Sequence, residues 1–334
     1  MATTTREFHL VSRPTGLPTA ENFRLAEREL PEPGAGQILV RNDVLSVDPY
    51  MRGRMNDVKS YVPAFQLDEP LEGGAVGTVL VSEDPAIPVG ASVLHNSGWR
   101  DHAILDAKQA TVVDTGRAPA GAYLNALGFI GLTAWGGLLI TAEFKAGDTV
   151  FVSGAAGAVG SLVGQIAKAK GAARVIGSAG GAAKGETLVS EFGYDAAIDY
   201  RAGDIRGQLS AAAPEGIDVY FDNVGGEHLE AALSVLKPHG RVALCGAISV
   251  YNSTEPPTAP HNLALAIGKR LTLRGFIVGD FFPRYAEFLG EMAPWLVNGQ
   301  VKATETVVDG LEKTPEAFIA LFSGGTTGKM LVKP

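Results

Sequence analysis

The stretch Thr149-Val-Phe-Val-Ser-Gly-Ala-Ala-Gly-Ala-Val-Gly160 decides the fold class of this 334-residue chain. It opens as a short apolar run of strand type and continues into a turn that contains three glycines. From Val159 to Ala167 apolar residues recur at helical spacing, and Gly171 follows as a C-cap. A glycine turn between a strand and a helix is typical of dinucleotide-binding sites, because the helix N-terminus offers unpaired N–H groups to a pyrophosphate.

Individual glycines of this turn have separate expected roles. Gly157 is predicted to let the backbone approach the pyrophosphate, and Gly160 to let the helix pack closely on the sheet. Ala155 stands at the first of the three glycine positions of the usual fingerprint. A glycine-rich turn without a ligand is the alternative, and the strands that follow it favour nucleotide binding.

Downstream of the turn, strand candidates alternate with helical patterns. Six such strands predict a parallel sheet covered by helices on both faces, the doubly wound α/β architecture. The strand candidates are residues 149–153, 174–178, 196–199, 217–222, 241–245 and 271–275. The helical patterns lie at 186–192, 205–213, 227–236, 262–268 and 284–297.

Upstream of the turn, residues 1 to about 115 have a β-rich pattern of short apolar runs separated by turn clusters. The run Lys329 to Lys333 is also strand-like, and we expect it to return to this β-rich region. The predicted division is therefore a discontinuous domain of residues 1–125 and 302–334, and a nucleotide-binding domain of residues 126–301. The β-rich strand candidates are residues 37–44, 75–81, 91–94, 103–105 and 111–113.

Charge and hydropathy exclude several classes of partner. The chain has 28 basic and 36 acidic residues and no Lys/Arg-rich run, so neither nucleic acid nor an anionic membrane is an expected partner. Residues 118–142 carry no charge and are long enough to span a bilayer. Because this stretch holds five glycines and Asn125, we expect two short buried helices, broken near Gly131.

The single cysteine, Cys245, can form no internal disulfide and no thiolate zinc cage, which fits a reducing cytoplasm. Residues 1–14 contain no apolar core of signal-peptide length, so secretion is not expected. The six histidines are scattered, and no nucleophilic serine motif is present. Without a metal or a covalent nucleophile, a bound cofactor has to carry the chemistry, which indicates hydride transfer.

The end of the second strand, Arg174 to Gly181, indicates which nucleotide is bound. NAD-dependent enzymes place a carboxylate there for the ribose hydroxyls, and this segment has none. Ser178 and the glycines leave room for a phosphate, and Lys184 follows closely enough to pair with it. We therefore expect NADP(H), with a solvated helix-face position as the alternative for Lys184.

Several segments together resemble one family. They are Asp48-Pro-Tyr-Met-Arg52, Leu127-Gly-Phe-Ile-Gly-Leu-Thr-Ala134, Ala155-Ala-Gly-Ala-Val-Gly-Ser161, Phe221-Asp-Asn-Val-Gly-Gly226 and Gly246-Ala-Ile-Ser-Val-Tyr-Asn252. The chain resembles the zinc-independent medium-chain dehydrogenases/reductases, and within them the NADPH-dependent double-bond reductases of alkenals, prostaglandins and curcumin. This resemblance implies a six-stranded Rossmann domain that binds NADP and a β-rich, GroES-like catalytic domain. A zinc alcohol dehydrogenase is rejected, because residues 47–52 and 71–77 supply no Cys or His ligand.

The same resemblance implies the cofactor contacts. Lys184 and Tyr200 would hold the 2′-phosphate, residues 158–161 would line the pyrophosphate, and the main chain of 276–278 would meet the carboxamide. Thr326 stands where the family commonly has Asn, and Ala183 where it often has Glu. The expected cofactor-binding residues are Gly157, Ala158, Val159, Gly160, Ser161, Ser178, Lys184, Tyr200, Asn223, Cys245, Gly246, Ile248, Tyr251, Phe276, Ile277, Val278 and Thr326.

Two tyrosines are the expected catalytic residues. The resemblance places Tyr251 beside the reacting carbonyl and Tyr50 along the substrate pocket, with a plain core aromatic as the alternative for Tyr50. The expected activity is NADPH-dependent reduction of the C=C bond of α,β-unsaturated aldehydes or ketones (enals and enones). The alternatives are a quinone oxidoreductase of the same superfamily and a non-catalytic NADPH-binding protein. The apolar helix region favours a homodimer.

Overall fold

The computed structural model describes residues 3–334 and divides into two compact units. Unit 1 contains the described residues up to Leu124, together with Glu305–Gly325 and Met330–Pro334. Unit 2 contains Asn125–Thr304 and Thr326–Lys329. The short segment Thr326–Lys329 therefore belongs to unit 2, although the residues on both sides of it belong to unit 1.

Unit 2 is built on a six-stranded sheet in which every neighbouring pair is parallel. The strand order is β10-β9-β8-β11-β12-β13, so the first strand in sequence lies at the centre and the chain winds outward in both directions. This is the doubly wound architecture that the sequence predicts. The strands are β8 (Thr149–Val152), β9 (Arg174–Ala179), β10 (Ala196–Asp199), β11 (Ile217–Asp222), β12 (Leu236–Leu244) and β13 (Thr272–Gly275).

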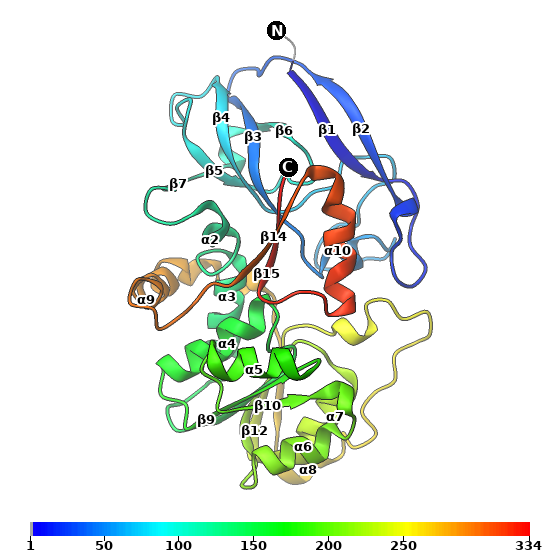
Figure 1. Ribbon diagram of the computed structural model, residues 1–334, viewed down its shortest axis with the longest axis vertical. Helices are drawn as coiled ribbons and strands as arrows, with labels where there is room; N and C mark the ends of the chain where they lie inside the picture. Colours follow the sequence, from blue (N-terminus) through cyan, green and yellow to red (C-terminus); the bar gives the residue numbers. More distant parts are fainter. Residues whose placement is uncertain (1–2) are drawn as a thin grey trace. The chain divides into compact units, whose positions relative to one another are not determined.

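Helices cover both faces of this sheet, with α4 and α5 on one face and α6, α7 and α8 on the other (Figure 1). The face under α6 and α7 holds a core of buried aliphatic and aromatic residues that includes Phe151, Ile176 and Tyr220. The helices of unit 2 are α3 (Phe129–Gly136), α4 (Ala158–Ala169), α5 (Ala182–Ser190), α6 (Ile205–Ala212), α7 (Gly226–Val235), α8 (Leu265–Lys269) and α9 (Tyr285–Val297).

Unit 1 contains a seven-stranded sheet and a separate antiparallel pair. The sheet order is β14-β15-β3-β4-β5-β7, and β6 also pairs with β3. The tail strand β15 pairs antiparallel with β3, so it joins the β-rich part of the chain as its sequence predicts. The strands are β1 (Thr3–Leu10), β2 (Phe23–Leu30), β3 (Gln37–Ser46), β4 (Ala75–Ser82), β5 (Ser92–His95), β6 (His102–Asp106), β7 (Thr111–Val113), β14 (Glu305–Asp309) and β15 (Lys329–Lys333), and the helices are α1 (Met51–Arg54), α2 (Ala120–Leu124) and α10 (Thr314–Ser323).

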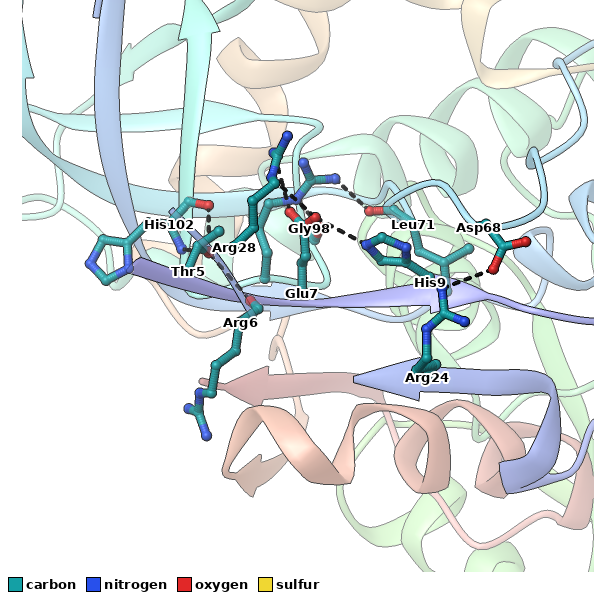
Figure 2. Close-up of polar contacts among 11 residues, drawn as sticks. Thr5, Arg6, Glu7, His9, Arg24, Arg28, Asp68, Leu71, Gly98 and His102 are labelled. Atoms are coloured by element: carbon teal, nitrogen blue, oxygen red, sulfur yellow. Dashed lines mark hydrogen bonds and ion pairs between the residues drawn. The ribbon is translucent and has the colours of Figure 1, made fainter. Parts of the chain in front are cut away.

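The pair β1–β2 is attached to the rest of unit 1 by buried polar contacts (Figure 2). Thr5 Oγ1 donates to the carbonyl oxygen of His102 and accepts from its N–H, both at 3.0 Å. Glu7 is only 1 % exposed, and its carboxylate lies 3.0 Å from His9 Nε2 and 3.4 Å from Arg28 Nε. A carboxylate is buried here because basic side chains surround it.

The sequence analysis missed four elements of unit 1, namely β1, β2, β14 and α10. It also placed the break within residues 118–142 wrongly. The structure has α2 ending at Leu124 and α3 beginning at Phe129, and Gly131 lies inside α3. A Cβ on Gly131 would lie 1.9 Å from the carbonyl oxygen of Ala126, so this glycine permits a close approach and does not break the helix. Within residues 3–334, no helix is long and apolar enough to cross a membrane.

Candidate functional site

The predicted cofactor residues of unit 2 follow the carboxyl ends of its parallel strands. Between the neighbouring strands β8 and β11, the direction of the chain's winding reverses. Ligands of open α/β sheets bind at such a switch point, outside the carboxyl ends of the strands. The site therefore extends from the loops after β9 and β10, past the glycine turn after β8, to the loops after β11, β12 and β13.

The glycine turn after β8 leads directly into α4. Gly154 has a φ of +59°, and Gly157 is the N-cap of the helix. A Cβ on Gly160 would lie 2.4 Å from the carbonyl oxygen of Gly154, so the close packing predicted for this glycine is present. Gly157, Ala158 and Val159 are partly exposed, whereas Ser161 is buried and its hydroxyl donates to the carbonyl of Ala158.

The tail segment Thr326–Lys329 lies against this turn. The N–H of Gly328 donates to the carbonyl oxygen of Ala156 at 2.8 Å. Lys184 Nζ donates to the backbone carbonyl oxygen of Thr326 at 2.6 Å. In this structure Thr326 therefore meets Lys184 through its main chain, a contact for which the identity of its side chain is unimportant.

Cationic groups gather around Gly180 and Gly181, between β9 and α5. A Cβ on Gly180 would lie 2.7 Å from the Tyr200 hydroxyl and 2.9 Å from Arg201 Nε, so both side chains lie over this glycine. Burial and the charge of Arg201 lower the pKa of Lys184. Two cations beside a glycine turn are suited to a dianionic group, and their expected contact with the 2′-phosphate of NADP remains a prediction.

Asp199 closes the other side of this turn. Its carboxylate accepts the N–H groups of Gly181 and Arg201, each at 2.9 Å, and these hydrogen bonds lower its pKa. Asp199 therefore orders the turn through backbone groups, and it remains ionised at neutral pH. Sequence reasoning missed Arg201, although its signal is visible as a second basic residue next to Tyr200 after a strand end.

Ser178 lies behind the cationic site. Its side chain is fully buried, and its hydroxyl oxygen lies 2.8 Å from Nε2 of His228 on α7. The His228 ring in turn packs against the Tyr200 ring at 5.5 Å in an edge-to-face geometry. The hydroxyl of Ser178 thus faces the interior and supports Tyr200 through His228, while the expected direct contact of Ser178 with the phosphate remains a prediction.

At the other end of the site, Asn223 is fixed by Ser153. The Asn223 side-chain amide donates to the Ser153 carbonyl at 2.8 Å, and the Asn223 N–H donates to the Ser153 hydroxyl at 3.0 Å. The preceding carboxylate, Asp222, is buried and accepts from Tyr220, Ser153 and two backbone N–H groups. Burial nevertheless raises the pKa of Asp222.

The loop after β12 contains Cys245, Gly246, Ile248 and Tyr251. Burial and the neighbouring Asp222 raise the pKa of the Cys245 thiol to about 12, so the thiol is neutral. The Tyr251 hydroxyl oxygen accepts the N–H of Ala247 at 3.3 Å. This contact brings the predicted catalytic phenol to the backbone of its own loop.

The loop after β13 contains Phe276, Ile277 and Val278. The Phe276 ring packs edge-on against Phe221 at 6.0 Å, and the Ile277 N–H donates to the Asp280 carboxylate at 3.1 Å. The main-chain donor at Ile277 is therefore already paired. The expected contact of residues 276–278 with a carboxamide remains a prediction.

Tyr50 belongs to unit 1, where it directly precedes α1. Its ring packs against the hydrophobic cluster that contains Met51, Met55 and Phe65. Burial and the charge of Asp48 raise its pKa, so its hydroxyl is protonated at neutral pH.

Comparison with known proteins extends along most of the chain. Residues 6–113 match the N-terminal domain of oxidoreductase, and residues 158–294 match a domain described as zinc-binding dehydrogenase. The NADPH-dependent curcumin reductase of Escherichia coli (strain K12) is 41% identical over 98% of this chain and 96% of its own length. The chain belongs to the medium-chain dehydrogenase/reductase family.

Two further relatives of this medium-chain reductase carry informative names. The 2-alkenal reductase (NADP(+)-dependent) of Nicotiana tabacum is 40% identical over 95% of this chain and 94% of its own length. The crystal structure of CurA from Vibrio vulnificus in complex with NADPH superimposes with a TM-score of 0.94, at 43% identity and with 98% of each chain covered. These likenesses confirm the family and the fold class that the sequence predicts.

One of the matching family descriptions mentions zinc. In the part of this medium-chain reductase that the structure describes, residues 3–334, no group of three or more His, Cys, Asp or Glu side chains could hold a metal ion. Burial lowers the pKa of His95 and of His228 to about 4, so both rings are neutral at pH 7.

The depressed pKa of His228 makes the stability of this reductase pH-dependent. Below the ordinary histidine pKa of 6.5 the unfolded chain takes up a proton that the folded chain binds only at about pH 4. Stability is therefore expected to fall as the pH decreases from about 6.5 to about 4. His228→Gln, which keeps a polar partner for Ser178, is expected to reduce this loss in urea unfolding measured at several pH values. Equal losses in both proteins would contradict the assignment to His228.

Proposed function

We propose that this protein is an NADPH-dependent reductase of the C=C bond of α,β-unsaturated aldehydes and ketones. The observation that carries the proposal is its likeness, over at least 95% of the chain, to a curcumin reductase and a 2-alkenal reductase that are named for NADPH or NADP. The cationic turn at Lys184 and the position of Tyr251 supply independent support.

The residues present fit NADP(H). The N-terminus of α4, with Gly157 as its N-cap, offers backbone N–H groups to a pyrophosphate. Tyr200 and Arg201 lie over Gly180, and Lys184 is near enough to Arg201 for the charge of Arg201 to lower its pKa. These groups are suited to holding the additional phosphate of NADP. At the end of β9 no carboxylate is present to hold ribose hydroxyls in the manner of NAD-dependent enzymes.

When bound, NADPH supplies a hydride, which forms a C–H bond at the β-carbon of the substrate. The C=C electron pair moves toward the carbonyl, and negative charge develops on its oxygen. Tyr251 is proposed to donate a hydrogen bond to this oxygen, and either Tyr251 or water delivers the proton to the α-carbon. The Ala247 N–H strengthens this donor, because a phenol oxygen that accepts a hydrogen bond polarises its own O–H group.

Tyr50 is proposed to line the substrate pocket. Its partly buried, protonated phenol offers an apolar ring and one polar atom, which suits a substrate that has an apolar body and one carbonyl.

The test is oxidation of NADPH in the presence of a panel of enals, aliphatic enones and aryl enones, with product analysis by mass spectrometry. We expect the saturated aldehyde or ketone as product. A quinone is included as a comparison substrate, since reduction of the quinone alone would identify the quinone oxidoreductase alternative. NADPH binding with no turnover of any acceptor would make the protein a non-catalytic binder.

We also propose a homodimer in the cytoplasm. Within the described chain, β13 has a strand neighbour on one side only, and Phe129, Ile277 and Phe282 are exposed in the same unit. An open strand edge beside apolar side chains is suited to pairing with a second copy. Light scattering is expected to give twice the chain mass of 34.8 kDa, and a mass of one chain would contradict the dimer. The single cysteine supports the cytoplasmic location.

A further inference from the structure

The loop after β12 is fastened to the loop after β11. The N–H groups of Cys245 and Gly246 both donate to the carbonyl oxygen of Asp222, at 2.9 and 3.0 Å. Further along, the N–H of Ile248 donates to the Asn223 carbonyl oxygen at 3.3 Å. These bonds fix the backbone of residues 245–248 relative to Asn223.

Gly246 lies at the centre of this arrangement, under the Tyr251 hydroxyl. A Cβ on Gly246 would lie 3.1 Å from the Tyr251 hydroxyl oxygen and 3.3 Å from the carbonyl oxygen of Asn223. Both distances are shorter than ordinary van der Waals contact with a carbon atom. A side chain at 246 therefore requires one of these two neighbours to move.

The Tyr251 hydroxyl is the neighbour that moves more easily. Asn223 is held by its own N–H and its side-chain amide, both of which donate to Ser153, and by the Ile248 N–H on its carbonyl. In contrast, the Tyr251 hydroxyl is the far end of a side chain, and its contact with the Ala247 N–H is long, at 3.3 Å. Displacement of the phenol costs less than displacement of the Asn223 backbone.

The backbone itself does not require glycine at this position. Gly246 is absent from the residues with positive φ, whereas Gly225 and Gly226 have φ values of +74° and +52°. Alanine could therefore adopt the conformation of residue 246 without strain. What glycine provides here is space.

We propose that Gly246 is a positioning residue for the proposed reduction. Because Gly246 has no side chain, the Tyr251 hydroxyl can lie where it accepts the hydrogen bond from the Ala247 N–H. The inference rests on the proposed function, because it assigns Gly246 an effect on the reacting carbonyl through Tyr251. Gly246 acts on the orientation of the phenol and makes no contact of its own with the reacting atoms.

The kinetic test is a double-mutant cycle. Gly246→Ala displaces the phenol by a few tenths of an ångström, and we expect kcat on an enone to fall about tenfold with the KM for NADPH unchanged. In the Tyr251→Phe background the same substitution is expected to have no further effect on kcat, because the group on which it acts has been removed. Gly290→Ala on α9, where a Cβ meets nothing within 4 Å, is the control and is expected to keep the wild-type kcat. Equal losses from Gly246→Ala in both backgrounds would overturn the proposal.

A second measurement does not depend on activity. The eight tyrosines are labelled with 3-fluorotyrosine, and the Tyr251 signal is identified as the ¹⁹F resonance that Tyr251→Phe removes. In Gly246→Ala we expect this resonance to shift while the other tyrosine signals stay in place. An unchanged Tyr251 signal would refute the claim that Gly246 positions the Tyr251 hydroxyl. If the wild-type protein reduces no enone, the proposed function fails, and the ¹⁹F spectra still decide whether Gly246 seats Tyr251.

Discussion

Replacing Tyr251 with phenylalanine is expected to lower kcat for enone reduction about a hundredfold, the usual loss when one hydrogen-bond donor to a developing oxyanion is removed. The ring remains, so packing of the loop after β12 is preserved. The dissociation constant of NADPH, measured by fluorescence titration, is expected to stay within about twofold of wild type, because the lost bond is made in the transition state.

The matched control for this variant is Tyr123→Phe. The Tyr123 hydroxyl donates to the backbone carbonyl of Asp114 at 2.7 Å in unit 1, and it belongs to no predicted site. Its removal is expected to leave kcat unchanged. A Tyr251→Phe variant with wild-type kcat would exclude Tyr251 as the donor and would leave water or a cofactor hydroxyl in that role.

The second large effect concerns nucleotide selectivity. Substituting alanine for Lys184 is expected to raise the KM for NADPH about tenfold to a hundredfold, since a hydrogen bond from a charged group contributes roughly 1.5–3 kcal/mol. The same change is expected to leave the KM for NADH nearly unaltered, because NADH lacks the phosphate. Arg201→Ala is expected to act in the same direction, and the double variant is expected to lose most of the preference for NADPH.

Lys168→Ala serves as the control for these variants. Lys168 lies on α4 and pairs with Asp195 at 2.9 Å, so its removal takes away a positive charge of the same unit without touching the turn at Gly180. If Lys184→Ala weakened NADPH and NADH equally, Lys184 would contribute only to the general binding of the nucleotide. We also expect added salt to lower the affinity for NADPH more steeply in wild type than in the Lys184→Ala, Arg201→Ala double variant. The reason is that salt screens the attraction between these cations and the phosphate.

The nucleotide-binding fold was predictable because its signals are local. The central strands β8, β9 and β11 of the parallel sheet are largely buried and therefore have apolar runs, as in Val150, Phe151 and Val152. The start of β12 was not predictable, because Pro238 and Gly240 within it resemble a turn. β1 and β2 were missed because charged residues interrupt their alternation, and the pairing of the buried Glu7 with Arg28 on the neighbouring strand is not visible in the local pattern.

In the candidate site, too, features set by neighbouring residues were predictable, and contacts between residues far apart in the sequence were not. The glycine turn and Lys184 could be found from spacing along the chain. The link from Ser178 through His228 to Tyr200 joins β9, α7 and the turn after β10, and no sequence pattern brings these residues together. Likewise, Thr326 was judged by its side chain, whereas its contact with Lys184 uses the backbone carbonyl, which every residue type has.

The pairing of β15 with β3 has a consequence for synthesis. Leu331 pairs with Ser46, about 285 residues earlier in the chain. At roughly 5–20 residues per second, the Leu45–Ser46 end of β3, which pairs with β15, waits about 15–60 s on the ribosome before that partner strand exists. During that interval an apolar strand edge is open to wrong partners, and a nascent chain of this protein depends on chaperone protection until its last strand has been made.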